Sequence, residues 1–219
     1  MRPLRIALAQ GALLADGLVA LAAAGCDTSG AEADGRSLVV RAGDREIVRA
    51  RPSDIATYVE RGAADLGIVG KDVLMESGAH VLELVDLGFG ACRFVVAAPR
   101  DAVARSLDDY RHLGSLEVAT KYPNVAERHF RARGIAVEII KVAGSTELAP
   151  QVGLADWIVD LVATGRTLEA NDLAVIEDIA PSTARLIANP AAYHARRDDI
   201  APLVEKLASW AAARAGSAR

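Results

Sequence analysis

The chain has 219 residues, of which 52% are hydrophobic and 25% charged, and its formal net charge is −4 at pH 7. This length and apolar content predict one globular unit or two small lobes with a substantial core. The negative balance argues against a general nucleic-acid-binding surface, so an anionic ligand must be held by local donors.

The N-terminal segment lacks the features of a signal peptide. Met1-Arg2-Pro3 leads directly into the strand-like run 4–9, and no stretch of the chain approaches a membrane span. Cys26 and Cys92 show no metal-ligand spacing with each other or with the four histidines. The sequence therefore predicts a cytoplasmic protein with reduced thiols, no membrane segment and no protein metal ligand.

Apolar runs separated by helical segments predict an alternating α/β architecture. The expected strands are 4–9, 37–41, 46–50, 65–69, 80–86, 92–98, 116–119, 136–142, 156–162 and 183–188. The second and third flank Ala42-Gly43-Asp44-Arg45, a turn-forming cluster, and are expected to pair as a hairpin.

Two helices are indicated by their end signals or their periodicity. Pro52-Ser53-Asp54 is a helix start, and Gly62 is the matching stop. Near the C-terminus, apolar residues recur at helical spacing on one face: Ile200, Leu203, Val204, Leu207 and Trp210. This face is expected to pack on the chain's own core, with a partner interface as the alternative.

A G-x-A-D step occurs twice, at 62–65 and at 153–156, each time before an apolar run. The repeat predicts two lobes, each with its own sheet, and a ligand in the cleft at the carboxyl ends of the strands. Gly70-Lys71-Asp72 and 164–167 then occupy equivalent strand ends. Chance similarity of two helix-to-strand turns is the alternative interpretation.

Residues 160–168, Asp-Leu-Val-Ala-Thr-Gly-Arg-Thr-Leu, have the composition of an anion-binding loop. The run 157–162 predicts a buried strand, and a helix is expected to begin near Leu168. Gly165 permits a tight turn, while amides at the helix start and the side chains of Thr164, Arg166 and Thr167 supply donors for phosphate oxygens. A plain strand-to-helix turn with a threonine cap is the alternative.

Five segments follow one another along nearly the whole chain: 51–55 (RPSDI), 64–72 (ADLGIVGKD), 120–124 (TKYPN), 144–150 (GSTELAP) and 160–168. Together they resemble the ATP phosphoribosyltransferase family, the first enzyme of histidine biosynthesis. The resemblance implies an α/β, two-lobed fold like that of type II periplasmic binding proteins, with a cleft between the lobes. Lobe one is expected at 1–90 plus 180–219, and lobe two at 91–179.

The family joins the adenine N1 of ATP to the anomeric carbon of phosphoribosyl pyrophosphate and releases pyrophosphate. By resemblance, the ribose 5-phosphate is held at Ala163, Thr164, Gly165, Arg166 and Thr167, Asp160 contacts the ribose hydroxyls, and Glu147 lies in the same cleft. Mg²⁺ is expected to arrive on the phosphates of the two substrates.

The resemblance also implies that Arg36 and Arg51 are catalytic, because a guanidinium can bind two oxygens of the departing pyrophosphate at once. A solvated surface position is the alternative for each. Asp72 is a further expected substrate contact, and Lys71 and Lys121 are weaker candidates. A lysine at the rim of the cleft, or one paired with a carboxylate, is the alternative for each of the two.

One family motif is altered. The family usually has K-G-R after the first strand, whereas this chain has Gln10-Gly11-Ala12. Gln10 and Gly11 remain expected substrate contacts, but both cations are missing. Ala163 also replaces a usual serine, although its backbone amide remains. The altered motif keeps two alternatives open: a non-catalytic module that senses a small anion, and a degenerate subunit of an assembly.

The resemblance is to the short form of the family, because little sequence follows the helix near 200–214 to build a regulatory domain. The chain is therefore expected to form a homodimer and to assemble with a regulatory subunit similar to histidyl-tRNA synthetase. Histidine feedback would then require that second chain.

Overall fold

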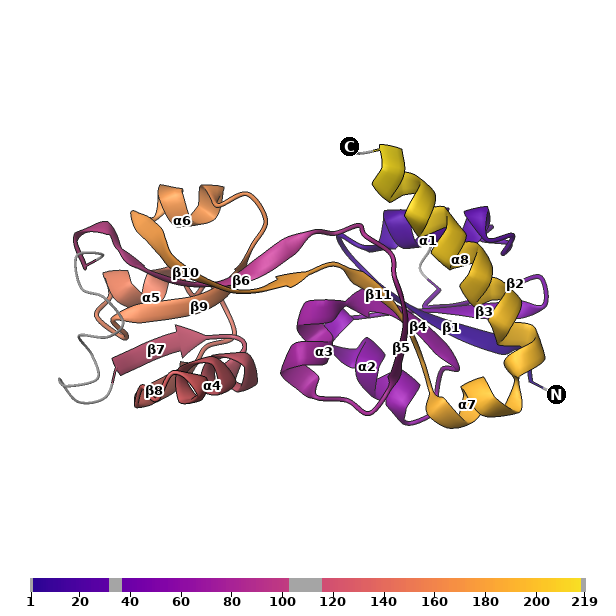
Figure 1. Ribbon diagram of the computed structural model, residues 1–219, viewed down its shortest axis with the longest axis horizontal. Coiled ribbons are helices and arrows are strands. Elements are labelled where there is room, and N and C mark those ends of the chain that lie inside the picture. The colour runs from indigo at the N-terminus through magenta and orange to yellow at the C-terminus, as the bar shows by residue number, and fades with distance from the viewer. Residues whose placement is uncertain (1, 32–36, 103–115, 218–219) are drawn as a thin grey trace. The chain divides into compact units, whose positions relative to one another are not determined.

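The computed structural model describes residues 2–31, 37–102 and 116–217 (Figure 1). The chain divides into two compact units. Unit 1 comprises Met1–Ala91 and Thr183–Arg219, and unit 2 comprises Cys92–Ser182. Among the helices of these ranges, none is both long enough and apolar enough to cross a membrane.

Unit 1 contains a six-stranded mixed sheet in the order β2-β3-β1-β4-β11-β5. β1 runs parallel to β3 and β4, whereas β11 is antiparallel to β4 and β5, and β2 is antiparallel to β3. The strands are β1 (Leu4–Ala9), β2 (Val39–Ala42), β3 (Arg45–Ala50), β4 (Leu66–Gly70), β5 (Leu82–Asp86) and β11 (Ala184–Ala188).

Helices cover both faces of this sheet (Figure 1). α1 (Leu14–Ala23) and α8 (Arg197–Ser217) pack with Ile6 and Leu8, while α2 (Pro52–Glu60) and α3 (Lys71–Ser77) pack with Ala7 and Ala9. Successive residues of β1 thus pack into the cores on opposite faces of the sheet, which explains why the sequence of this strand is an uninterrupted apolar run. α7 (Pro190–Ala195) precedes α8.

The expected burial of the C-terminal helical face is confirmed. Ile200, Leu203 and Leu207 are buried in the core of unit 1, and Val204 and Trp210 pack against it. The hairpin of β2 and β3 is also confirmed.

Unit 2 contains a five-stranded mixed sheet in the order β10-β6-β9-β7-β8. β7 is parallel to β8 and β9, and β6 is antiparallel to β9 and β10. The strands are β6 (Cys92–Pro99), β7 (Leu116–Thr120), β8 (Val137–Lys141), β9 (Trp157–Val162) and β10 (Leu173–Ser182). α4 (Pro123–Ala132) packs on one face, and α5 (Leu148–Gln151) and α6 (Arg166–Ala170) on the other. A short 3-10 turn spans Arg100–Ala102.

The sequence did not indicate β10. Its pairing with β6 has irregularities between Val175 and Glu177 and between Asp178 and Ala180, which break the two-residue alternation that marks a strand. Pro181 lowers its strand propensity further, and β10 is an edge strand, where proline is tolerated.

The two G-x-A-D steps have the same backbone turn but different environments. Gly62 and Gly153 have φ values of 72° and 69°, and each step leads into a strand, β4 or β9. Asp65 is buried, whereas Asp156 is exposed.

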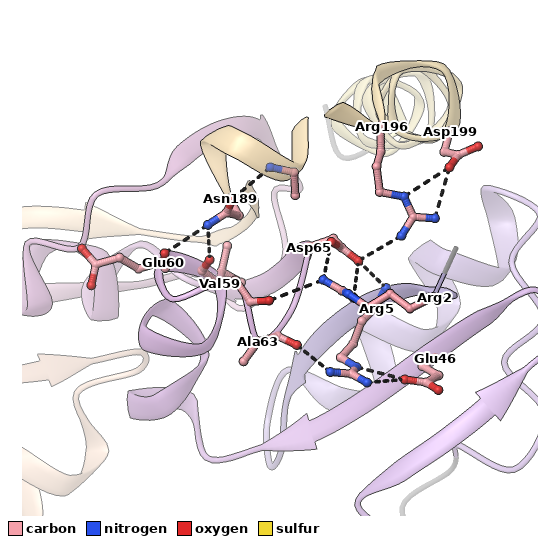
Figure 2. Close-up of polar contacts among 12 residues, drawn as sticks. Arg2, Arg5, Glu46, Val59, Glu60, Ala63, Asp65, Asn189, Arg196 and Asp199 are labelled. Carbon is pink, nitrogen blue, oxygen red and sulfur yellow. Dashed lines mark hydrogen bonds and ion pairs between the residues drawn. The ribbon is translucent and has the colours of Figure 1, made fainter. Parts of the chain in front are cut away.

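Asp65 is the centre of a polar network in unit 1 (Figure 2). Its carboxylate accepts hydrogen bonds from Arg2 Nη1 at 2.9 Å, Arg2 Nη2 at 2.8 Å and the Arg5 backbone N–H at 2.9 Å. Arg196 Nη1 lies 3.4 Å from Asp65 Oδ2 and its guanidinium also pairs with Asp199. The network joins β1, the start of β4 and the start of α8.

Candidate active site

The predicted anion-binding loop is a tight turn between β9 and α6. Gly165 has φ 85°, a conformation that favours glycine, and it is the N-cap of α6. The helix begins at Arg166, two residues before the predicted start near Leu168, because Gly165 completes the turn at once. The first helical hydrogen bond runs from the Glu169 N–H to the Gly165 carbonyl, so the N–H groups of residues 166–168 have no helical acceptor.

This loop borders a cavity of about 260 Å³ in unit 2. The lining residues are Glu147, Asp160, Leu161, Val162, Ala163, Thr164, Gly165, Thr167 and Leu168. Seven of the predicted contacts are therefore brought together: Glu147, Asp160, Ala163, Thr164, Gly165 and Thr167 line the cavity, and Arg166 is their exposed neighbour in the chain. Backbone amides and threonine hydroxyls at a helix start can hold a phosphate-sized anion.

Asp160 is buried in the wall of this cavity. Its Oδ1 accepts a hydrogen bond from the Leu161 N–H at 2.8 Å, its Oδ2 accepts one from the Thr146 hydroxyl, and Lys121 Nζ lies 3.6 Å from Oδ2. These contacts fix the carboxylate close to the loop. Thr146, which is fully buried, was not singled out in the sequence although it lies within the G-S-T-E-L-A-P segment.

A second group of predicted residues lies at the carboxyl ends of adjacent strands in unit 1. The Gln10 N–H donates to the Ala50 carbonyl at 2.9 Å, which places Gln10 and Gly11, after β1, next to Arg51, after β3. Arg51 is exposed and is the N-cap of α2. Ligands of open α/β sheets bind at such strand ends.

Lys71 and Asp72 follow β4, the other neighbour of β1. The Lys71 ammonium forms an ion pair with Glu83 of β5. The Asp72 carboxylate lies against Gly70, where an added Cβ would approach Asp72 Oδ1 to 2.1 Å. Gly70 thus allows the carboxylate to fold back over the strand end.

Arg36 lies outside the described residues. Within the described ranges, no group of three or more His, Cys, Asp or Glu side chains is placed to hold a metal ion.

The chain matches known proteins over most of its length. A family model described as ATP phosphoribosyltransferase matches residues 51–209. The ATP phosphoribosyltransferase of Rubrobacter xylanophilus is 51% identical over 204 residues, covering 93% of this chain and 94% of that protein. The one from Moorella thermoacetica is 52% identical over 210 residues, covering 93% and 91%.

Solved structures confirm the predicted fold class. The ATP phosphoribosyl transferase (HisG:HisZ) complex from Thermotoga maritima has a chain that matches with a TM-score of 0.81 and 31% identity, covering 95% of this chain and 98% of that one. The substrate binding protein of an amino acid ABC transporter matches with a TM-score of 0.59 at 12% identity, covering 98% and 94%, which shows the shared fold alone. By its matched residues and its close relatives, the chain belongs to the ATP phosphoribosyltransferase family, the enzymes of the first step of histidine biosynthesis.

Proposed function

We propose that the cavity beside α6 holds the ribose 5-phosphate of phosphoribosyl pyrophosphate while ATP supplies the nucleophile. The observation that carries this proposal is the turn 163–167, where Gly165 is the N-cap of α6 and Ala163, Thr164, Gly165 and Thr167 line the cavity. Asp160, fixed by Thr146 and Leu161, accepts hydrogen bonds from the ribose hydroxyls. Glu147 lines the same cavity and takes part in orienting the sugar.

The chemistry needs charge stabilisation more than a strong base. The free lone pair of adenine N1 forms the new bond to the anomeric carbon, and the bond to pyrophosphate breaks with its electron pair leaving on the phosphate oxygen. Arg51 and Arg36 stabilise the leaving pyrophosphate, and Gln10, Gly11, Lys71 and Asp72 complete its surroundings. Mg²⁺ enters as part of the substrates, bound to phosphate oxygens and water, as suits a hard cation.

Binding measurements on loop variants test the phosphate assignment. We expect Arg166→Ala and Thr167→Val each to weaken the affinity for phosphoribosyl pyrophosphate about tenfold in calorimetry, because each removes a donor to the phosphate. Arg197→Ala, another exposed arginine at a helix start, and Thr57→Val, an exposed helical threonine, are matched controls that leave the affinity unchanged. Unchanged binding in both loop variants, with normal thermal stability, would refute the assignment.

The regulatory partner is a further part of the proposal. The Thermotoga maritima relative was solved as a HisG:HisZ complex. We propose that this chain forms a homodimer and joins a regulatory subunit similar to histidyl-tRNA synthetase, which carries the histidine site.

A histidine titration of the purified chain, with and without that subunit from the same organism, tests this partnership. We expect the chain alone to keep its activity at histidine concentrations that inhibit the reconstituted complex, because a ligand shifts an equilibrium only through a site that distinguishes the states. Strong inhibition of the isolated chain would count against a separate regulatory subunit.

A further inference from the structure

Lys121 lies beside the buried carboxylate of the proposed sugar-phosphate site. β7 and β9 are neighbouring parallel strands with Thr120 opposite Val159, so Lys121, the residue after β7, and Asp160, the next residue of β9, lie side by side towards the carboxyl ends of the two strands. Lys121 Nζ is 3.6 Å from Asp160 Oδ2, and the side chains are 37% and 8% exposed. The pair therefore joins a solvated cation to a carboxylate that water barely reaches.

The backbone that carries Lys121 is held from both sides. The Thr120 hydroxyl donates to the Val159 carbonyl at 2.7 Å and accepts from the Tyr122 N–H at 2.9 Å. The Tyr122 ring meets Phe94 edge-on, with centroids 4.9 Å apart. These contacts fix the backbone after β7, so the Cα of Lys121 has a defined position next to Asp160.

A phosphate site lined by a buried carboxylate has an electrostatic conflict. Asp160 borders the same cavity as Thr164, Gly165 and Thr167, where an anionic substrate is proposed to bind. An uncompensated negative charge there would repel the phosphate through a poorly screened medium. At 3.6 Å the Lys121 ammonium offsets this charge without a short hydrogen bond, so Asp160 keeps acceptor capacity for a sugar hydroxyl.

We infer that Lys121 is a positioning residue that acts through Asp160: it neutralises and orients this carboxylate so that one site can bind a hydroxylated sugar and its phosphate together. The inference rests on the proposed function. It assigns Lys121 no direct contact with the substrate, which separates it from the arginines proposed to bind pyrophosphate.

A double-mutant cycle tests the inference, with calorimetric titration of phosphoribosyl pyrophosphate as the readout. We expect Lys121→Met to weaken binding about tenfold in the wild-type background and less than about twofold in the Asp160→Asn background, where there is no charge left to offset. Lys121→Arg should stay within about twofold of wild type, since it keeps the cation. The matched control is Lys141→Met. Lys141 is an exposed lysine of the neighbouring strand β8, opposite Thr120, and its substitution should leave the affinity unchanged.

An equal loss in both backgrounds, or no loss in either, would overturn the inference. If Asp160→Asn folds poorly, two other results would overturn the inference. One is binding by Lys121→Arg as weak as that by Lys121→Met, and the other is a loss of affinity in Lys141→Met equal to the loss in Lys121→Met. Failure of the proposed function is distinguishable, because it leaves Arg166→Ala and Thr167→Val with wild-type affinity. Failure of this inference leaves those two variants weak.

Discussion

At the scale of single residues, the turn after β1 lacks the two cations that the sequence resemblance leads us to expect at positions 10 and 12. Gln10 and Gly11 lie beside Arg51, and Gly11 has φ 82°, which a side chain at this position would resist. Ala12 is exposed and follows directly. The backbone turn is thus present, while the positive charge that the resemblance predicts there is absent.

Restoring that charge should therefore improve the enzyme. We expect Ala12→Arg to raise turnover about three- to tenfold, or to tighten inhibition by pyrophosphate, because it adds a charged donor where negative charge develops. Ala12→Gln, which adds length without charge, is the control. Steady-state kinetics identical to wild type in both respects would show that position 12 does not face the leaving group.

At the scale of elements, an ion pair links the end of α4 to β10, and a partly buried histidine lies beside it. Arg133, just after α4, forms an ion pair with Glu177 of β10, and His129 Nε2 lies 3.4 Å from the other carboxylate oxygen. Burial, followed by the positive charge of Arg133, lowers the pKa of His129. His129 is therefore neutral near pH 7 and is harder to protonate in the folded protein than in the unfolded chain.

This shift predicts a direction for stability against pH. Below about pH 6.5, the unfolded chain takes up a proton at His129 before the folded protein does, so folding free energy is lost as the pH falls towards the lowered pKa. The slope from this one group is at most about 1.4 kcal/mol per pH unit. His129→Gln should weaken the pH dependence of the urea-unfolding midpoint between pH 7 and 5. His194 is an exposed histidine of α7, and His194→Gln should leave that pH dependence unchanged. Equal pH dependence in wild type and His129→Gln would contradict this account.

At the scale of the whole molecule, Asp65 joins parts of unit 1 that are far apart in the sequence (Figure 2). Arg2 comes from the N-terminus and Arg196 from the segment before α8, and both reach the same buried carboxylate. The Asn189 side chain adds a second link, since its amide donates to the carbonyls of Val59 and Glu60 while its oxygen caps α7.

Breaking the Asp65 network should destabilise unit 1 without touching the proposed site. We expect Asp65→Asn to lower the free energy of unfolding by about 2 kcal/mol, because the arginines lose a buried anion, although the partial exposure of Arg2 limits the cost. Asp156→Asn, the exposed counterpart in the second G-x-A-D step, should change it by less than about 0.5 kcal/mol. Equal destabilisation of the two variants in urea unfolding would refute the distinction.

Much of the site was predictable because it is local in the chain. The turn 163–167 contains its own glycine, its own helix start and its own hydroxyls, so a short window carries the whole geometry of the proposed phosphate site. The same holds for the apolar strands buried on both faces, such as β1, whose composition alone marks them. β10 was missed because its irregular pairing and Pro181 hide the strand pattern.

The sequence by itself determined the α/β alternation, the family and the tight turn between β9 and α6, since propensity, periodicity and ordered motifs are properties of neighbouring residues. Only the tertiary structure decided which of two similar aspartates is buried, that Lys71 pairs with Glu83, and that Lys121 and Thr146 meet at Asp160. Those contacts depend on strand order and register, which bring together residues far apart in the chain. No local sequence pattern predicts these contacts, because they form and stabilise the fold only once the strands have paired.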